Sequence, residues 1–136
     1  MQVGTDTTWD KFGHGYTHLL AVKTDNTLWS WGYNPFGNLG LNDRGPAGAT
    51  SRSSPTQIPG TNWSQVATGY LTSAATKTDG TLWTWGENEG GQLGQNTQAG
   101  APDYLTSLSS PTQVGTGTGW ADPGGSREEF FAKRIL

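Results

Sequence analysis

An internal repeat constrains the fold of this 136-residue chain more than any other feature of its sequence. The segment KTDNTLWSWG at residues 23–32 recurs as KTDGTLWTWG at residues 77–86, and the GNLG that follows the first copy returns as GQLG at the same offset of 54 residues. The segment SPTQI at 54–58 recurs as SPTQV at 110–114 with an offset of 56 residues, so two additional residues lie in the intervening loop. A period of this length is typical of folds that stack copies of one supersecondary unit.

A third copy begins near the end of the chain. QVGT at 113–116, followed by Trp120, repeats QVGT at 2–5, followed by Trp9, and the match stops after Trp120. We therefore expect a partial repeat domain over 1–120, with repeat 1 at about 2–57, repeat 2 at about 58–113, an aborted third repeat at 113–120 and a non-repeat tail at 121–136.

The core of such units must be built largely from tryptophan. Only 32% of the residues are hydrophobic, yet the chain has seven Trp, and 21 of its residues are Gly. Because large rings bury much area per residue, Trp packed against Ala, Thr and Val can supply a core where aliphatic residues are scarce. Gly, Thr, Asn and Ser dominate the remainder, which is typical of short strands joined by many turns.

Local chemistry places four short strands in the second unit, at 63–68, 73–77, 81–85 and 110–114. Asp79-Gly80 predicts a two-residue hairpin turn with positive φ at both positions, and Asp25-Asn26 occupies the same place in the first unit. Pro111 places the last strand at a sheet edge. Four antiparallel strands in about fifty residues are typical of a β-propeller blade, so the predicted fold class is all-β, a partial propeller of about two blades.

The tryptophans of each unit occupy fixed places in the third strand. Alternation puts Trp83 and Trp85 on one face of this strand and Leu82 on the other, and Trp29 and Trp31 take the corresponding positions in the first unit. We expect at least one Trp of each pair to be buried between neighbouring sheets.

The tail has a different pattern. The SREE segment at 126–129 is a capping box, and FFAKRIL at 130–136 follows it, which predicts a short C-terminal helix that packs on the blades or on another molecule. The alternative is that the tail is a truncation or reading-frame artefact.

Charge and composition exclude several functions. The net charge of −3 comes from sparse charges of both signs, so there is no basic stripe for nucleic acid. We expect no membrane span and no secretory signal, because the sequence has neither a long apolar run nor a basic and apolar start. The absence of Cys removes thiolate chemistry, and no cofactor is predicted. The localisation stays open, with an extracellular surface or a virion among the alternatives.

The repeat resembles that of the regulator of chromosome condensation family over roughly residues 1–120. The matching elements are VATG at 66–69, TDGTLWTWG at 78–86, Asn88 and GQLG at 91–94. In the first unit Gly15–His18 matches the Gly-x-x-His step of the family, whereas the second unit has Thr72 where His is usual. This resemblance implies a propeller of about seven blades. Members of the family act as exchange factors, inhibitors, photoreceptors or scaffolds, so it specifies the fold better than the function.

The branches of the family can be compared with this sequence. The ultraviolet photoreceptor branch carries Gly-Trp-Arg-His-Thr, but residues 15–19 read GYTHL and lack both the Trp and the Arg. The exchange-factor branch uses a protruding wedge, and no such segment can be identified here. We therefore predict a non-enzymatic protein-binding or scaffold module. The alternatives are part of a regulatory propeller such as a guanine-nucleotide exchange factor, or a self-associating structural repeat protein.

Candidate site residues come from the loops at 41–53 and 95–109, which differ most between the units. They contain Arg44, Arg52, Asp103, Tyr104 and Leu105, and Arg and Tyr are enriched at binding hot spots. These five residues are the predicted contacts to a protein partner.

Other residues that carry chemistry have structural explanations. A metal shared by His14 and His18 needs a bend at Gly15 and lacks further ligands nearby in the sequence. The paired Asp25 and Asp79 are explained by their hairpin turns rather than by catalysis.

Two blades cannot close a disc, and an open pair leaves strand edges exposed. We expect the chain to be a fragment whose missing blades belong to a longer propeller, because its third repeat is broken. A homo-oligomer that closes by association is the alternative.

Overall fold

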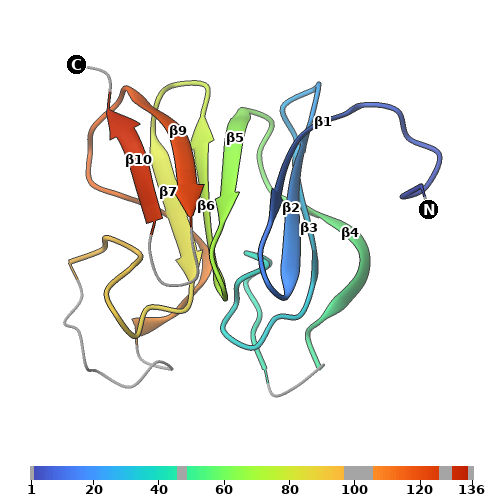
Figure 1. The fold of residues 1–136 in the computed structure, drawn as a ribbon, viewed down its shortest axis with the longest axis horizontal. Coiled ribbons are helices and arrows are strands. Elements are labelled where there is room, and N and C mark those ends of the chain that lie inside the picture. Colours follow the sequence, from blue (N-terminus) through green and yellow to red (C-terminus); the bar gives the residue numbers. More distant parts are fainter. Residues whose placement is uncertain (1, 46–48, 97–105, 126–129, 135–136) are drawn as a thin grey trace.

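The computed structural model describes residues 2–45, 49–96, 106–125 and 130–134. Blade 1 is a four-stranded antiparallel sheet of β1 (Trp9–His14), β2 (His18–Lys23), β3 (Leu28–Gly32) and β4 (Arg52–Ile58). Blade 2 consists of β5 (Trp63–Thr68), β6 (Thr72–Lys77), β7 (Leu82–Gly86) and β8 (Leu108–Gln113). The third sheet contains β9 (Trp120–Gly125) and β10 (Phe130–Arg134), and the three sheets lie side by side in chain order (Figure 1).

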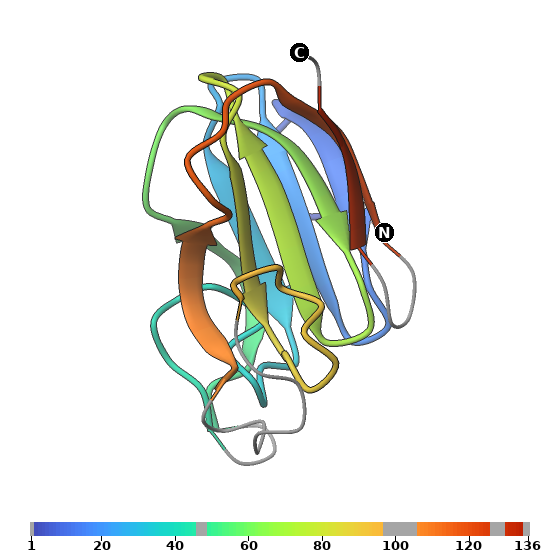
Figure 2. The same cartoon turned by 90° about the vertical axis from the view of Figure 1, so that its left-hand side faces the viewer.

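The sheets meet along their first strands. In each blade the strand order follows the chain order, so β1 and β5 are edge strands at one side and β4 and β8 are edge strands at the other. β5 lies against β1 and β2, and β9 lies against β5 and β6. Figure 2 shows the sheets stacked face to face. The predicted pair of four-stranded antiparallel blades, with Pro111 on an edge strand, is therefore confirmed.

The hairpin turns lie where the sequence predicts them, but their backbone differs from the prediction. Positive φ occurs at Asn26 (64°) and Gly80 (82°), and not at Asp25 or Asp79. The amide of Asn26 donates to the carbonyl of Lys23 at 2.9 Å, which closes a turn whose last residue is left-handed. The prediction of two left-handed residues is wrong because each loop is one residue longer than the predicted two-residue turn. A three-residue loop needs only one left-handed position.

The predicted C-terminal helix is wrong over residues 130–134, where the chain forms β10. This strand pairs antiparallel with β9, with Phe130 opposite Gly125 and Arg134 opposite Trp120. A helix of a little over two turns is marginal alone, whereas β9 offers a row of backbone groups, and Phe favours strands. Residues 126–129 and 135–136 lie outside the described residues.

The third sheet continues the geometry of the blades. The first strand of each sheet begins with a Trp opposite a basic residue, as the pairs Trp9–Lys23, Trp63–Lys77 and Trp120–Arg134. The amide of Trp63 donates to the carbonyl of Asn26 at 3.0 Å, and the amide of Trp120 donates to the carbonyl of Gly80 at 2.9 Å. β9 is therefore attached to blade 2 in the same way as β5 is attached to blade 1.

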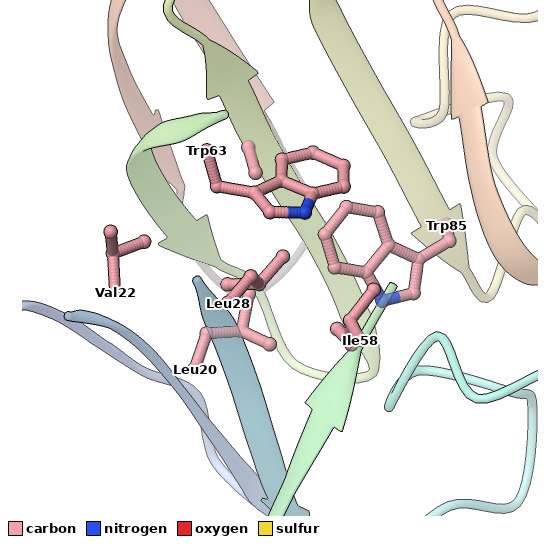
Figure 3. Close-up of a cluster of buried hydrophobic side chains, with 7 residues drawn as sticks. Leu20, Val22, Leu28, Ile58, Trp63 and Trp85 are labelled. Atoms are coloured by element: carbon pink, nitrogen blue, oxygen red, sulfur yellow. The ribbon is translucent and has the colours of Figure 1, made fainter. Parts of the chain in front are cut away.

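The contact between the two blades is asymmetric. Blade 1 contributes aliphatic side chains and blade 2 contributes indole rings, and the buried cluster consists of Leu20, Val22, Leu28, Ile58, Trp63, Ala75 and Trp85 (Figure 3). Trp85 is 0% exposed, and its Nε1 donates to the carbonyl of Asn38 in blade 1 at 2.9 Å. Each blade thus has an aliphatic face and a Trp face, and the aliphatic face of blade 1 packs against the Trp face of blade 2.

The burial of the Trp pairs follows from this asymmetry. The prediction is confirmed for Trp83 and Trp85, because Trp85 is buried, and wrong for Trp29 and Trp31, which are both half-buried. Trp29 and Trp31 pack around Trp9 at centroid distances of 6.2 and 6.0 Å. No strand of the described chain packs on this Trp face of blade 1, so burial there requires another blade.

The two blades offer a matched test of the contact. We expect Trp85→Ala to lower the free energy of unfolding by about 3–5 kcal/mol, because it opens a cavity between the blades. Trp31→Ala, at the equivalent but half-buried position, should cost clearly less. Urea unfolding of both variants measures the difference, and equal losses would contradict the asymmetric contact.

Candidate functional site

The connections that differ most between the blades lie at one end of the sheets, which we call the loop end. It consists of the turns at 15–17 and 69–71 and the described parts of the loops at 33–51 and 87–107. Because the strands alternate in direction, both turns and both loops emerge at this end, which is the lower end in Figure 1. The side chains at this end are therefore the ones that the repeat itself does not require.

A buried asparagine shapes each long loop. Asn34 is 1% exposed and Asn88 is 2% exposed. The Oδ1 of Asn34 accepts from the amide of Leu39 at 3.0 Å, and Asn88 does the same for Leu93 at 3.0 Å. The Gly-x-Leu-Gly turns are thereby held against the blades, so the loops start from a rigid base.

The two predicted arginines that the structure describes serve the loops themselves. Arg44 donates from Nη1 to the carbonyl of Ser107 at 3.1 Å, a bond that joins the loop of blade 1 to that of blade 2. Arg52 forms an ion pair with Asp43 at 2.5 Å. The predicted contacts Asp103, Tyr104 and Leu105 lie outside the described residues. A partner contact through any of the five stays a prediction.

Among the aromatic side chains that the structure describes at the loop end, the most exposed one was missed. Tyr16 is 79% exposed and stacks on Tyr70, with 4.8 Å between ring centroids and 31° between planes. Thr17 links the two turns by donating from Oγ1 to the carbonyl of Tyr70 at 3.4 Å. Tyr33, 38% exposed, follows β3 at the same end. A signal was present in the sequence, because Gly-Tyr occurs at 15–16 and again at 69–70 with the offset of the repeat.

A buried polar network lies beneath these tyrosines. His18 is 1% exposed, and its Nε2 is 2.8 Å from the Oγ of Ser73. That hydroxyl donates to the carbonyl of Asn38 at 2.7 Å, so it accepts from His18, and Nε2 carries the proton. Burial lowers the pKa of His18 to about 4. The imidazole is therefore neutral at pH 7 and joins blade 1 to blade 2.

The other titratable candidates do not form a reactive site. His14 is exposed, whereas His18 is buried, and no group of three or more His, Cys, Asp or Glu is placed to hold a metal ion within the described part of the chain. Asp25 accepts from the amide and Oγ1 of Thr27 at 3.1 and 2.6 Å, and these bonds lower its pKa. Asp79 does the same with Thr81. The structural explanation of both aspartates as turn residues is confirmed.

Comparisons with known proteins agree with the geometry. Stacked four-stranded antiparallel sheets that meet along their first strands are β-propeller blades. The model of the "Regulator of chromosome condensation (RCC1) repeat" matches residues 25–76 and 79–120, and a second model of the same description matches 63–92. The chain belongs to the RCC1 repeat family.

Several curated proteins are similar over part of the chain. The protein RCC2 homolog of Danio rerio is 39% identical over 88 residues, which cover 62% of this chain and 17% of that protein. The ultraviolet-B receptor UVR8 of Arabidopsis thaliana is 37% identical over 83 residues, which cover 59% of this chain and 18% of the receptor. The probable E3 ubiquitin-protein ligase HERC6 of Homo sapiens is 39% identical over 82 residues, which cover 58% of this chain and 8% of the ligase.

Solved structures show the same fold. Yeast RCC1 (Prp20), in its structure with Kap60, superposes with a TM-score of 0.73 at 20% identity, covering 92% of this chain and 30% of that chain. Human WBSCR16 superposes with a TM-score of 0.70 at 27% identity, covering 91% of this chain and 30% of that chain. The chain thus spans about a third or less of the proteins that it resembles. No helix among the described residues is long and apolar enough to cross a membrane.

The His18 network predicts a pH-dependent stability. The unfolded chain takes up this proton near the ordinary pKa of 6.5, and the folded chain does so at about 4. The contribution of neutral His18 to the free energy of unfolding is therefore complete above pH 6.5. It is lost as the pH falls towards 4, which lowers the free energy of unfolding by up to about 3 kcal/mol. Urea midpoints of the parent chain and His18→Gln between pH 4 and 7.5 measure it. Parallel pH profiles for the two proteins would contradict the buried neutral imidazole.

Proposed function

We propose that the chain is a non-enzymatic protein-binding module of a regulatory propeller and that the loop end carries its contact surface. The observation that carries this proposal is the exposed stack of Tyr16 on Tyr70. Aromatic rings that are already packed lose little conformational entropy on binding, and Tyr is enriched among the residues that dominate binding energies. The turns that hold this stack begin and end in strands of the two packed blades.

The surroundings of the stack suit a protein surface better than a small substrate. Tyr33 adds a second exposed ring at the same end, next to Tyr16 and the half-buried Tyr70. The hydrogen bond from Arg44 to Ser107 joins the adjacent loops. The Ser73 hydroxyl beside His18 is 0% exposed and accepts from Nε2 instead of donating to it. That pair is therefore not arranged as a nucleophile and its base, and the proposal includes no reaction. Support for a protein partner comes from yeast Prp20, which one solved structure describes with Kap60 bound and another describes by its binding to Gsp1p and histones.

Substitution of the stack tests the contact surface. A photo-reactive amino acid at position 16 identifies the partner by crosslinking and mass spectrometry. We then expect the double variant Tyr16→Ala, Tyr70→Ala to weaken binding of that purified partner by roughly thirtyfold or more, as for hot-spot residues. Calorimetric titration measures the affinity. Thr24→Ala, at the opposite end of blade 1, is the matched control, and equal affinities for all three proteins would contradict a contact at the loop end.

Self-association is a second candidate function, favoured by the Trp face of blade 1. Trp9, Trp29 and Trp31 are all half-buried there, and Phe12 beside them is 57% exposed. In blade 2 the equivalent face is covered by aliphatic side chains of blade 1. A second copy that covers the open face would bury apolar area worth about 25 cal/mol per Å².

Sedimentation distinguishes the two candidates. If copies associate through this face, the parent chain forms a reversible oligomer and Trp31→Lys shifts it to the monomer, because a buried lysine lacks a partner there. Tyr16→Ala, away from the Trp face, should leave the oligomer unchanged. A monomeric parent chain at the highest soluble concentration would exclude self-association.

A further inference from the structure

The two blades hold equivalent lysines in different electrostatic surroundings. In blade 1 the Nζ of Lys23 lies over the rings of Trp9 and Trp29, at 4.7 and 4.1 Å from their centroids. The carboxylate of Asp6 completes this site at 2.6 Å from Nζ. Asp6 is itself held by the amide of Thr8 at 2.8 Å. In blade 1 the ammonium group of Lys23 therefore contacts a carboxylate and two indole rings.

Blade 2 repeats the cation and the rings without the acid. The Nζ of Lys77 lies 4.8 Å from the centroid of Trp63 and 4.0 Å from that of Trp83. Counted back from the first Trp of each blade, the position of Asp6 is taken by Gly60. No described carboxylate lies within ion-pair distance of Lys77. The cation is thus oriented by two rings. Hydrogen bonds from Thr81 lower the pKa of Asp79, and Asp79 also lies close enough for Lys77 to help lower it, but no described carboxylate takes the place beside Lys77 that Asp6 has beside Lys23.

A pocket of about 420 Å³ opens beside Lys77. Lys77, Trp63 and Trp83 line it together with Pro59 and Pro111. It therefore lies between blade 1 and blade 2, beside the edge strand β8 and the connection that leads into β5. Its size falls in the range of pockets that hold compact ligands, and its walls are largely apolar with one cationic group.

We infer that this Lys77 pocket binds an aspartate or glutamate side chain of an acidic peptide segment supplied by a protein partner. The carboxylate would take the place on Lys77 that Asp6 takes on Lys23. A charge-assisted bond is strengthened where ring faces exclude water. The proline and indole walls would pack against the neighbouring residues of the peptide, since a lone carboxylate fills little of the pocket.

This inference does not rest on the contact proposed at the loop end, although residues 40–42 of the loop at 33–51 also line the pocket. Lys77 ends β6 at the turn that leads into β7, whereas Tyr16 and Tyr70 lie in turns at the other end of the strands. Variants of Tyr16 and Tyr70 therefore test one proposal and variants of Lys77 test the other, so either proposal can be contradicted without the other.

A model peptide tests the pocket directly. The probe is the blocked peptide acetyl-Gly-Thr-Asp-Thr-Thr-amide, which reproduces the segment around Asp6, and the control probe carries Asn instead of Asp. The readout is the indole N–H resonances of Trp63 and Trp83 in heteronuclear NMR spectra, because both rings line the pocket. We expect saturable shifts with the Asp peptide, and binding of the Asn peptide that is weaker by roughly tenfold or more.

Protein variants locate the binding. Lys77→Met keeps the apolar stem of the side chain and removes the charge, so it should abolish the shifts, and Lys23→Met should leave them unchanged because Asp6 already occupies that cation. Thermal melting shows whether Lys77→Met stays folded; if it does not, the comparison of the Asp and Asn peptides on the parent chain decides. Equal binding of the two peptides, persistence of the shifts in folded Lys77→Met, or equal affinity for sodium acetate would overturn the inference.

Discussion

The packing of the aliphatic face of blade 1 against the rings of Trp63 and Trp85 is the contact on which the rest of the structure depends. A chain with few aliphatic residues cannot make both faces of every sheet aliphatic, so each blade places its large rings on one face and small or aliphatic side chains on the other. The contact also requires close approach: a Cβ at Gly40, where φ is +71°, would lie 2.8 Å from the Nε1 of Trp85. The blades therefore pack with an aliphatic face of one against the Trp face of the next, and the Trp face of blade 1 stays uncovered.

The features at the loop end follow from this contact. The carbonyl of Asn38 accepts from Trp85 and from Ser73, and Ser73 accepts from His18, so the buried indole and the buried imidazole meet at a single backbone group of blade 1. The separation of the blades then sets the distance between equivalent turns. That distance, rather than anything within one turn, brings Tyr16 onto Tyr70 at 4.8 Å.

Much of the fold could be predicted from the sequence because its signals are local and occur twice. The strands of blade 2 and both Asp turns lie where periodicity and turn chemistry place them. β10 could not be predicted in this way, because the local preference of its segment was judged without its partner β9, and strand pairing is not a local property. The partners of the loop arginines within the chain could not be predicted for a related reason, because the path of the loops brings Ser107 within reach of Arg44 and Asp43 within reach of Arg52.

The differences between the repeats carry more functional information than their similarities. Where both blades share a residue, as with the Asp–Thr–Trp hydrogen bonds of the turns, the shared backbone already requires it. Where the blades share backbone and packing but differ in one side chain, the shared structure does not explain that difference. Blade 2 has Thr72 at the position of His18 and therefore lacks that titratable group. It has Gly60 at the position of Asp6, so Lys77 lies over its two indole rings without the carboxylate that pairs with Lys23. Because Trp63 and Trp83 hold Lys77 as Trp9 and Trp29 hold Lys23, the charge at Lys77 keeps its position although the Asp6 equivalent is gone, and this difference between the repeats points to the pocket beside Lys77.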